Sequence, residues 1–350
     1  SLGYLNDNGI VMNSNFKRYN IRFNSQHDIV KNLTFGENIS LVNTNQNIVE
    51  TRGSYDGVLS AALFNMPNTP VWADEANQVY GLPKGDFPNP VASLNSRDNV
   101  QKNYAFTGNV YFEYKLLKMF TLRTDFGYNT GYGKNKNFVA IAKDGGRGLS
   151  ANSLSEGFAT SYTRIWNNTL SFDKTFGVHH ISGLAGMSME SGYSDWTNSG
   201  TAKDFSNQDP ALRYFNNAGS FPNHVSGSAD DYSLLSYFGR VSYVFSDRYL
   251  LSANIRADGS SKFPSDKRWG IFPSVSAGWR ISKEAFFAGM LDVVSDLKLR
   301  GSWGQLGNDK IPNYQYYSTI TSVGSPTLNG GSFTAQAQDR FANTDIKWEV

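Results

Sequence analysis

Residue types that usually carry out chemistry are few in this sequence of 350 residues. It contains no cysteine, which excludes disulfides, thiolate metal sites and thiol nucleophiles. Of the four histidines, His179 and His180 are adjacent, and His27 lies in an expected turn. Successive side chains of a strand point to opposite faces of a sheet, so His179 and His180 cannot share one metal ion. We therefore predict no metal site and no cofactor.

Catalytic motifs are missing as well. The sequence has no Gly-x-Ser-x-Gly nucleophile elbow. Gly131 and Gly133 lack the third glycine of a dinucleotide-binding loop, because Lys136 stands in its place. Two acidic pairs, at 74–75 and 230–231, lie in expected loops, where they keep those loops soluble. We therefore do not expect an enzyme.

One polar cluster, formed by Arg256, Asp258 and Gly259, stands where an expected strand enters a loop. Residues two apart on a strand share a face, so Arg256 and Asp258 can form an ion pair that braces the strand. A carboxylate beside arginines could instead bind a cation or a sugar. Gly259 can adopt the positive φ that a turn requires. Arg280 and Arg300 are expected to brace neighbouring strands in the same way.

The elements that position these residues are predicted to be strands, because apolar and polar side chains alternate along many segments. Most of them are about eleven residues or longer, close to the roughly 9–11 tilted residues that cross a bilayer. No helix is predicted, and the longest apolar run, 138–142, has five residues, whereas a membrane-spanning helix needs roughly 20. The twelve segments are 1–6, 15–25, 31–46, 103–115, 119–129, 158–173, 179–192, 232–245, 248–258, 269–282, 296–306 and 340–350.

Connections between these segments alternate in length, as in an outer-membrane barrel with short periplasmic turns and long external loops. The short ones fall at 25–31, 115–119, 173–179 and 245–248, with a longer one on the same side at 282–296. The long ones fall at 46–103, 129–158, 192–232 and 306–340, and the shorter connections at 6–14 and 258–269 fall on their side. The sequence thus predicts an all-β protein with a partial transmembrane antiparallel β-barrel. The alternative is a surface β-sandwich that binds glycans without transport, since antiparallel sheets with one wet face show the same alternation.

Aromatic residues make up 14% of the chain and divide into two groups. Tyr249, Trp269, Trp279 and Trp303 lie near strand ends or on apolar faces, where rings settle at the lipid boundary. Trp72, Tyr193 and Trp196 fall in expected outer loops and are candidates for stacking on a substrate, although packing within the loop explains them equally well. The net charge of +2 offers no field for a polyanion, so no nucleic-acid partner is expected.

Longer motifs give the sequence a family resemblance. The stretches YFGRVSYVFSDRYLLSANIRADGSSKF at 237–263, RWGIFPSVSAGWRIS at 268–282 and DLKLRGSWGQLGN at 296–308 resemble the SusC/RagA family of TonB-linked outer-membrane proteins. Supporting matches are SLGYLNDNGI at 1–10, FKRYNIRFN at 16–24, MPNTPVW at 66–72 and ANTDIKWE at 342–349. The sequence departs from the usual pattern at Pro264, Trp303 and Leu306. Asn308 closes the third motif and is expected to have a structural role.

The resemblance implies a barrel of about 22 strands closed by an N-terminal plug. Residues 1–350 would be an N-terminal portion of the barrel, with the plug and the last strands outside this stretch. It further implies a Gram-negative outer-membrane importer of oligosaccharides or peptides, with a SusD-like lipoprotein as a lid and the TonB complex as the source of energy. Lipid would surround the wall. A passive porin is a third possibility.

Overall fold

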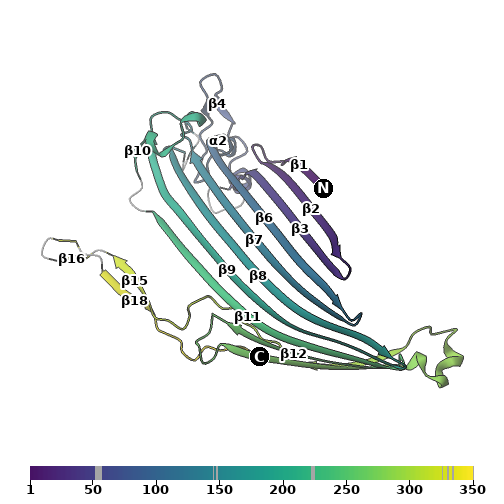
Figure 1. Cartoon of the computed structure of the whole chain (residues 1–350). Coiled ribbons are helices and arrows are strands. Elements are labelled where there is room, and N and C mark those ends of the chain that lie inside the picture. The colour runs from purple at the N-terminus through teal and green to yellow at the C-terminus, as the bar shows by residue number, and fades with distance from the viewer. Residues whose placement is uncertain are drawn as a thin grey trace.

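The computed structural model describes every residue except 52–56, 145, 147–148, 222–224, 325, 329–330, 333–334 and 350. Its main feature is one curved antiparallel sheet of long tilted strands (Figure 1). Eleven strands follow each other in chain order, each paired with its neighbours, and the short β10 (Ala218–Ser220) pairs with β9. The eleven are β1 (Leu2–Asn8), β2 (Asn15–Val30), β3 (Leu33–Asn47), β6 (Arg97–Leu116), β7 (Phe120–Val139), β8 (Ser153–Phe176), β9 (His179–Phe205), β11 (Ser226–Phe245), β12 (Tyr249–Ser260), β13 (Trp269–Arg280) and β14 (Lys298–Gly304).

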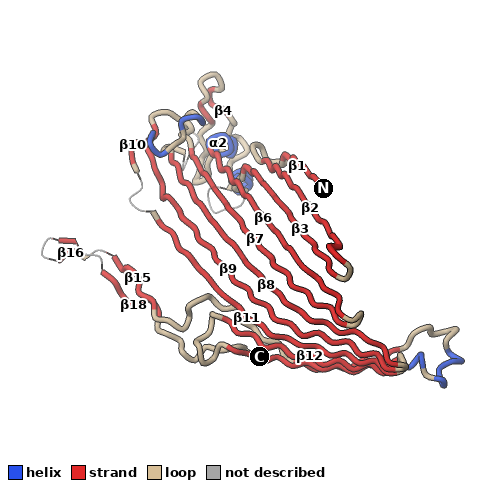
Figure 2. The backbone as a smooth tube through the Cα atoms, viewed as in Figure 1, coloured by secondary structure: helices blue, strands red, loops and turns tan. Residues whose placement is uncertain are grey.

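The two ends of the sheet differ, as the alternation of loop lengths predicts. Tight turns join the strands at one end, where Leu117, Lys118, Ser246 and Asp247 take the positive φ of short hairpins. The connection from β13 to β14 at the same end carries the 3-10 helices η3 (Ile281–Lys283) and η4 (Ala285–Met290). We call this the turn end of the sheet, and Figure 2 shows the long connections gathered at the other, the loop end.

The loop end holds most of the structure outside the sheet. Two helices, α1 (Val58–Phe64) and α2 (Pro90–Ser96), and the hairpin of β4 (Trp72–Asp74) and β5 (Val79–Tyr80) lie between β3 and β6. Further along are η1 (Pro210–Leu212), η2 (Phe215–Asn217) and the paired strands β15 (Thr319–Gly324) with β18 (Ala335–Arg340) and β16 (Thr327–Leu328) with β17 (Gly331–Ser332). The sequence predicts none of these helices, because two turns or fewer are too short to show a helical period. No described helix has the length and hydropathy of a membrane-spanning segment.

Two expectations about strands were wrong. Residues 341–349 do not form a strand, because they make only an isolated bridge between Glu349 and Asn308, and Val350 lies outside the described residues. Several strands also run far beyond their expected ends, up to 27 residues in β9. This length places Tyr193 and Trp196 inside β9 and not in a loop.

Most of the buried apolar residues lie at the loop end and not on the face of the sheet. One cluster joins Tyr80, Ala92, Ala142 and Leu149, and a second joins Phe138, Leu154, Ala202 and Phe205. On the sheet itself, large apolar side chains such as Val241 and Ile271 remain 56% and 60% exposed. A sandwich would cover these side chains with a second sheet. In the described parts of the chain no second sheet does so, and the sandwich alternative is therefore contradicted.

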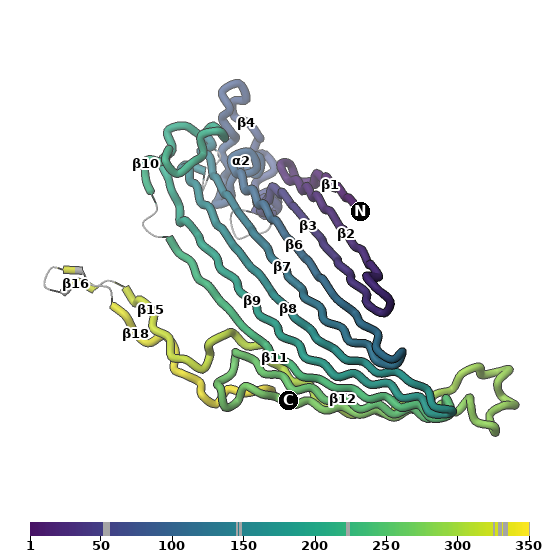
Figure 3. Tube along the Cα trace, viewed as in Figure 1, coloured from purple at the N-terminus to yellow at the C-terminus, as the bar shows by residue number. Residues whose placement is uncertain are grey.

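At the two edges of the sheet, β1 and β14 each pair on one side only, so the described strands form an open wall (Figure 3). This matches the expected partial barrel.

Candidate functional site

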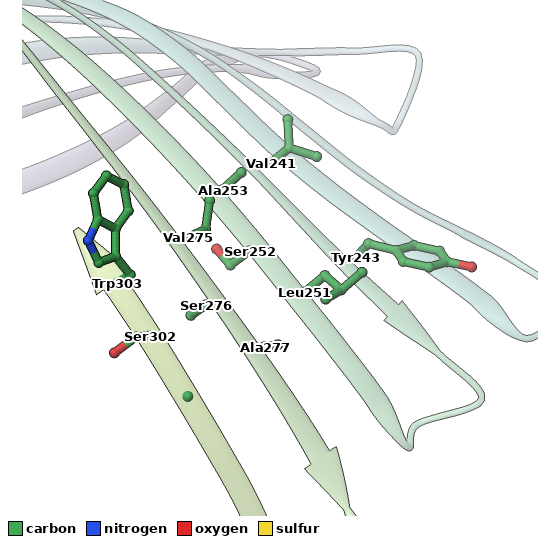
Figure 4. Close-up of a pocket in the computed structure, with 11 residues that line it drawn as sticks. Val241, Tyr243, Leu251, Ser252, Ala253, Val275, Ser276, Ala277, Ser302 and Trp303 are labelled. Carbon is green, nitrogen blue, oxygen red and sulfur yellow. The ribbon is translucent and has the colours of Figure 1, made fainter.

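The strand register divides the side chains of the sheet into two faces. Val241, Ala253, Val275 and Trp303 are successive partners across β11–β14 and form one row of what we call the apolar face. Their neighbours Arg240, Asn254 and Ser274 form a row of the polar face, because successive residues point to opposite sides. Figure 4 shows Val241, Val275 and Trp303 around a shallow hollow of about 610 Å³ on the apolar face.

Polar side chains on the polar face bond to each other across strands. Arg256 Nε donates to both carboxylate oxygens of Asp258, at 2.7 and 2.8 Å, and its Nη2 donates to Ser236 Oγ at 2.9 Å. Asp258 is only 8% exposed. The predicted Arg256–Asp258 ion pair is therefore present and extends across β11 and β12. On β6 and β7, Arg123 lies 3.5 Å from Glu113 and 3.7 Å from Asp125.

Gly259 has a different role from the predicted one. It lies within β12, opposite Trp269 of β13, and has no positive φ. A Cβ built at Gly259 would come within 3.0 Å of the indole ring of Trp269. Any larger residue at position 259 would clash with the tryptophan that lies across it. This contact depends on the pairing of β12 with β13, so no local sequence signal reveals it.

The other structural candidates lie at the ends of strands. Arg280 pairs with Asp247 and thereby fixes the turn between β11 and β12. Arg300 lies on the polar face of β14 and forms no ion pair with a described carboxylate. Asn308 Nδ2 donates to Glu349 Oε2 at 2.8 Å, so it joins two segments beyond the sheet.

Aromatic rings mark the turn end of the apolar face. Tyr249 Oη and Trp279 Nε1 donate to Glu284 Oε1 in the connection between β13 and β14, at 2.8 and 2.9 Å. These bonds, the one from Trp279 first, and the nearby charge of Arg248 lower the pKa of Glu284. Each ring thus keeps its apolar body on the face and its polar atom toward water, as rings at a membrane boundary do.

Two of the three candidate stacking residues are occupied by protein contacts. Trp72 stacks on Tyr80, with centroids 4.2 Å apart, and packs against a buried cluster of the loop end. Tyr193 lies on the apolar face, where it stacks on Tyr162 at 5.3 Å. Neither ring is therefore available on the polar face to stack on a ligand.

Trp196 is the exception, because it stays 48% exposed and lines a hollow of about 400 Å³ near the loop end. A row of register partners, Asn103, Gly133, Ala159 and Trp196, crosses β6–β9 on the polar face. The rest of the lining includes four carboxamide side chains, Asn99, Gln101, Asn135 and Asn198. It also includes Lys134, whose charge is paired with Glu156 at 3.1 Å. We call this the amide hollow.

The shape of the amide hollow follows from small residues in its floor. A Cβ at Gly157 would come within 2.2 Å of Asn135 Oδ1, so the missing side chain leaves room for the amide. Amides accept and donate hydrogen bonds without charge, and an indole ring offers an apolar plane. Such a surface suits a neutral polar ligand. The sequence does not single out these amides as a site, although the alternation of Asn99, Gln101 and Asn103 along one strand face could have indicated them.

Comparisons with known proteins agree on one family. The model described as "TonB dependent receptor-like, beta-barrel" matches residues 6–350. TonB-dependent receptor P3 of Formosa agariphila is 28% identical over 99% of this chain and 35% of its own length. TonB-dependent receptor SusC of Bacteroides thetaiotaomicron is 27% identical over 100% and 36%. The chain thus spans about a third of these relatives.

Among solved structures, the RagAB peptide transporter superposes with a TM-score of 0.83 at 21% identity, over 99% of this chain and 39% of the matched chain. At this identity the likeness shows the fold alone.

Proposed function

Because this chain belongs to the TonB-dependent receptor-like β-barrel family, we propose that residues 1–350 form part of the wall of an outer-membrane importer. The observation that carries the proposal is the apolar face, whose large side chains stay exposed along the eleven strands of the sheet, nine of them with 12 residues or more. Lipid contacts this face, and the polar face lines a wet or plugged lumen. The wall has no chemistry of its own.

We further propose that this wall belongs to a complete importer with a plug, a lid and a source of energy. A plug preceding this stretch and further strands following it complete a barrel of about 22 strands. TonB pulls on the plug, and a SusD-like lipoprotein covers the loop end, where helices α1 and α2 and the β4–β5 hairpin lie. The names of SusC and of the RagAB transporter among the similar proteins support this arrangement.

For the substrate, we propose an oligosaccharide or a peptide that contacts the amide hollow. The indole ring of the hollow can stack on the face of a sugar. Its uncharged amides can hydrogen-bond to the hydroxyls of an oligosaccharide or to the backbone amides of a peptide. Trp196 is the residue expected to stack. Because Trp72 and Tyr193 are engaged with other rings, they drop out as contacts of this hollow.

The two faces can be tested by labelling, since the chain has no cysteine of its own. Val275 and Ser276 are adjacent on β13 and point to opposite faces. In membranes containing the complete receptor, a hydrophilic maleimide is expected to label S276C readily and V275C only after detergent is added. Equal labelling of both would contradict the barrel wall. Uptake that persists without TonB would instead indicate a passive porin.

The substrate contact is tested in the same receptor with a panel of peptides and neutral oligosaccharides. W196A should weaken binding of the recognised ligand by about ten-fold, the upper range for one aromatic contact. W303F, on the apolar face, is the matched control and should bind as the wild type does. Unchanged affinity of W196A would remove the amide hollow from the proposal but leave the wall intact.

A further inference from the structure

The connection between β13 and β14, residues 281–297, differs from the others at the turn end. Those have two or three residues each, whereas this one carries the helices η3 and η4. Figure 2 shows it as the blue and tan segment that projects from the turn end of the sheet, at the lower right. Two residues suffice to join antiparallel strands, so the length of this connection calls for a further role.

Exposed apolar side chains cover much of this connection. Phe286 and Val293 are 70% and 87% exposed, and Met290 and Leu291 are exposed as well. Phe287, next to the first of them, is buried. A group of large apolar side chains on one short exposed segment marks a contact surface. We call Phe286, Met290, Leu291 and Val293 the apolar patch.

Contacts at the start of the connection hold it on the apolar side of the sheet. Glu284 Oε1 accepts from Trp279 Nε1 and Tyr249 Oη, whose rings lie on the apolar face. Glu284 Oε2 accepts from Arg248 Nη1 at 3.1 Å. Phe286 then packs edge-on against Trp279, with ring centroids 6.4 Å apart. The apolar patch therefore begins at a ring of the apolar face.

On β14, the apolar face leads to the other end of the same connection. Leu299 is the register partner of Trp279 and lies on the face that carries Trp303. Leu299 is exposed, and so is Leu297, the last residue of the connection. The exposed apolar surface of the sheet thus meets the connection at both of its ends.

The charges of the connection indicate what covers the apolar patch. Lys283 is its only basic residue, against the acidic Glu284, Asp292 and Asp296. Segments that bind anionic membranes carry clusters of lysine and arginine, which this connection lacks. The stretch 285–291 has no charge at all. A neutral apolar environment therefore suits the patch, and an anionic surface does not.

We propose that the apolar patch is an interfacial anchor in the inner leaflet of the outer membrane, among zwitterionic phospholipids. The inference rests on the proposed function, in which lipid contacts the apolar face and the turn end faces the periplasm. Apolar side chains of an interfacial segment lie roughly 5–10 Å into the boundary between headgroups and acyl chains. Trp279 lies at the edge of this layer, as rings at a membrane boundary do. Lys283 and Glu284 stay at its aqueous side.

Fluorescence quenching in the complete receptor tests the anchor, in nanodiscs of phosphatidylcholine that leave both membrane surfaces accessible. The variants F286C, V293C, K283C and V275C are each labelled with an environment-sensitive fluorophore. A phospholipid with a doxyl group near its headgroup should quench F286C and V293C, and aqueous iodide should quench K283C. Lys283 is the matched control, because it lies in the same connection but reaches Asp247 at 3.8 Å. V275C reports the wall itself.

The anchor requires lipid quenching at both F286C and V293C, and any other result overturns it. Quenching by iodide as strong as at K283C would place the patch in water. Protection from both quenchers would mean that another part of the receptor covers it, and lipid quenching that needs added phosphatidylglycerol would contradict the neutral contact. If lipid quenches V275C but not the patch, only the anchor is wrong. If V275C itself is not quenched by lipid, the proposed barrel wall fails.

Discussion

Asp258 shows how a charge on the polar face depends on its neighbours. Its carboxylate is nearly covered, and Arg256 donates two hydrogen bonds to it while also reaching Ser236 on the next strand. The spacing of two residues was enough to predict the pair from the sequence. The link to Ser236 was not predictable, because it depends on the register of β11 against β12.

We expect D258N in the complete receptor to lower the free energy of unfolding by about 1.5–3 kcal/mol, the range for hydrogen bonds to charged groups. The measurement is the temperature at which the folded, fast-migrating gel band is lost. D345N is the matched control, because Asp345 pairs with Lys267 at 2.7 Å but is 93% exposed. Exposed pairs contribute little, so this variant should melt like the wild type. Equal shifts in both variants would contradict a bracing role for Asp258.

At the scale of elements, the sequence identified eleven of the strands but not their ends. A bilayer imposes alternation only over its own thickness, and beyond it both faces of a strand meet water. The upper part of β9, Ser194–Asn198, has polar residues on both faces, so its period of two fades although the pairing continues. This is why the sequence predicts a loop at Tyr193 and Trp196. The amide hollow was missed for the same reason, since it lies in this polar extension.

The two ends of the sheet predict a pattern of proteolysis. Trypsin added to intact cells should cut the receptor after Lys84, which is exposed in the long connection between β3 and β6. Lys283, exposed in the connection between β13 and β14, should be cut only after the outer membrane is opened. The fragments are identified by mass spectrometry, in cells without the lid lipoprotein so that Lys84 is not covered. Cleavage after Lys283 in intact cells would invert the orientation.

For the whole molecule, the decisive feature is the open sheet. Each inner strand satisfies its backbone on both sides, whereas β1 and β14 have one neighbour each. In water an open edge is hydrated, but lipid offers no hydrogen bonds, and each unsatisfied group costs several kcal/mol there. The buried clusters at the loop end are too small to compensate, as they join only a few side chains each. The wall therefore depends on strands that close the barrel.

Residues 1–350 made on their own should consequently fail to fold under conditions in which the complete receptor refolds. We expect aggregation, or a gel band whose mobility does not change on heating, because a membrane barrel shows a folded band only when its edges are paired. The complete receptor, refolded in the same detergent, is the control for the procedure. A soluble, monomeric product that melts cooperatively would mean that other residues of this stretch cover the apolar face of the sheet. Neither contact with lipid nor a barrel wall would then be needed to explain why that face is apolar.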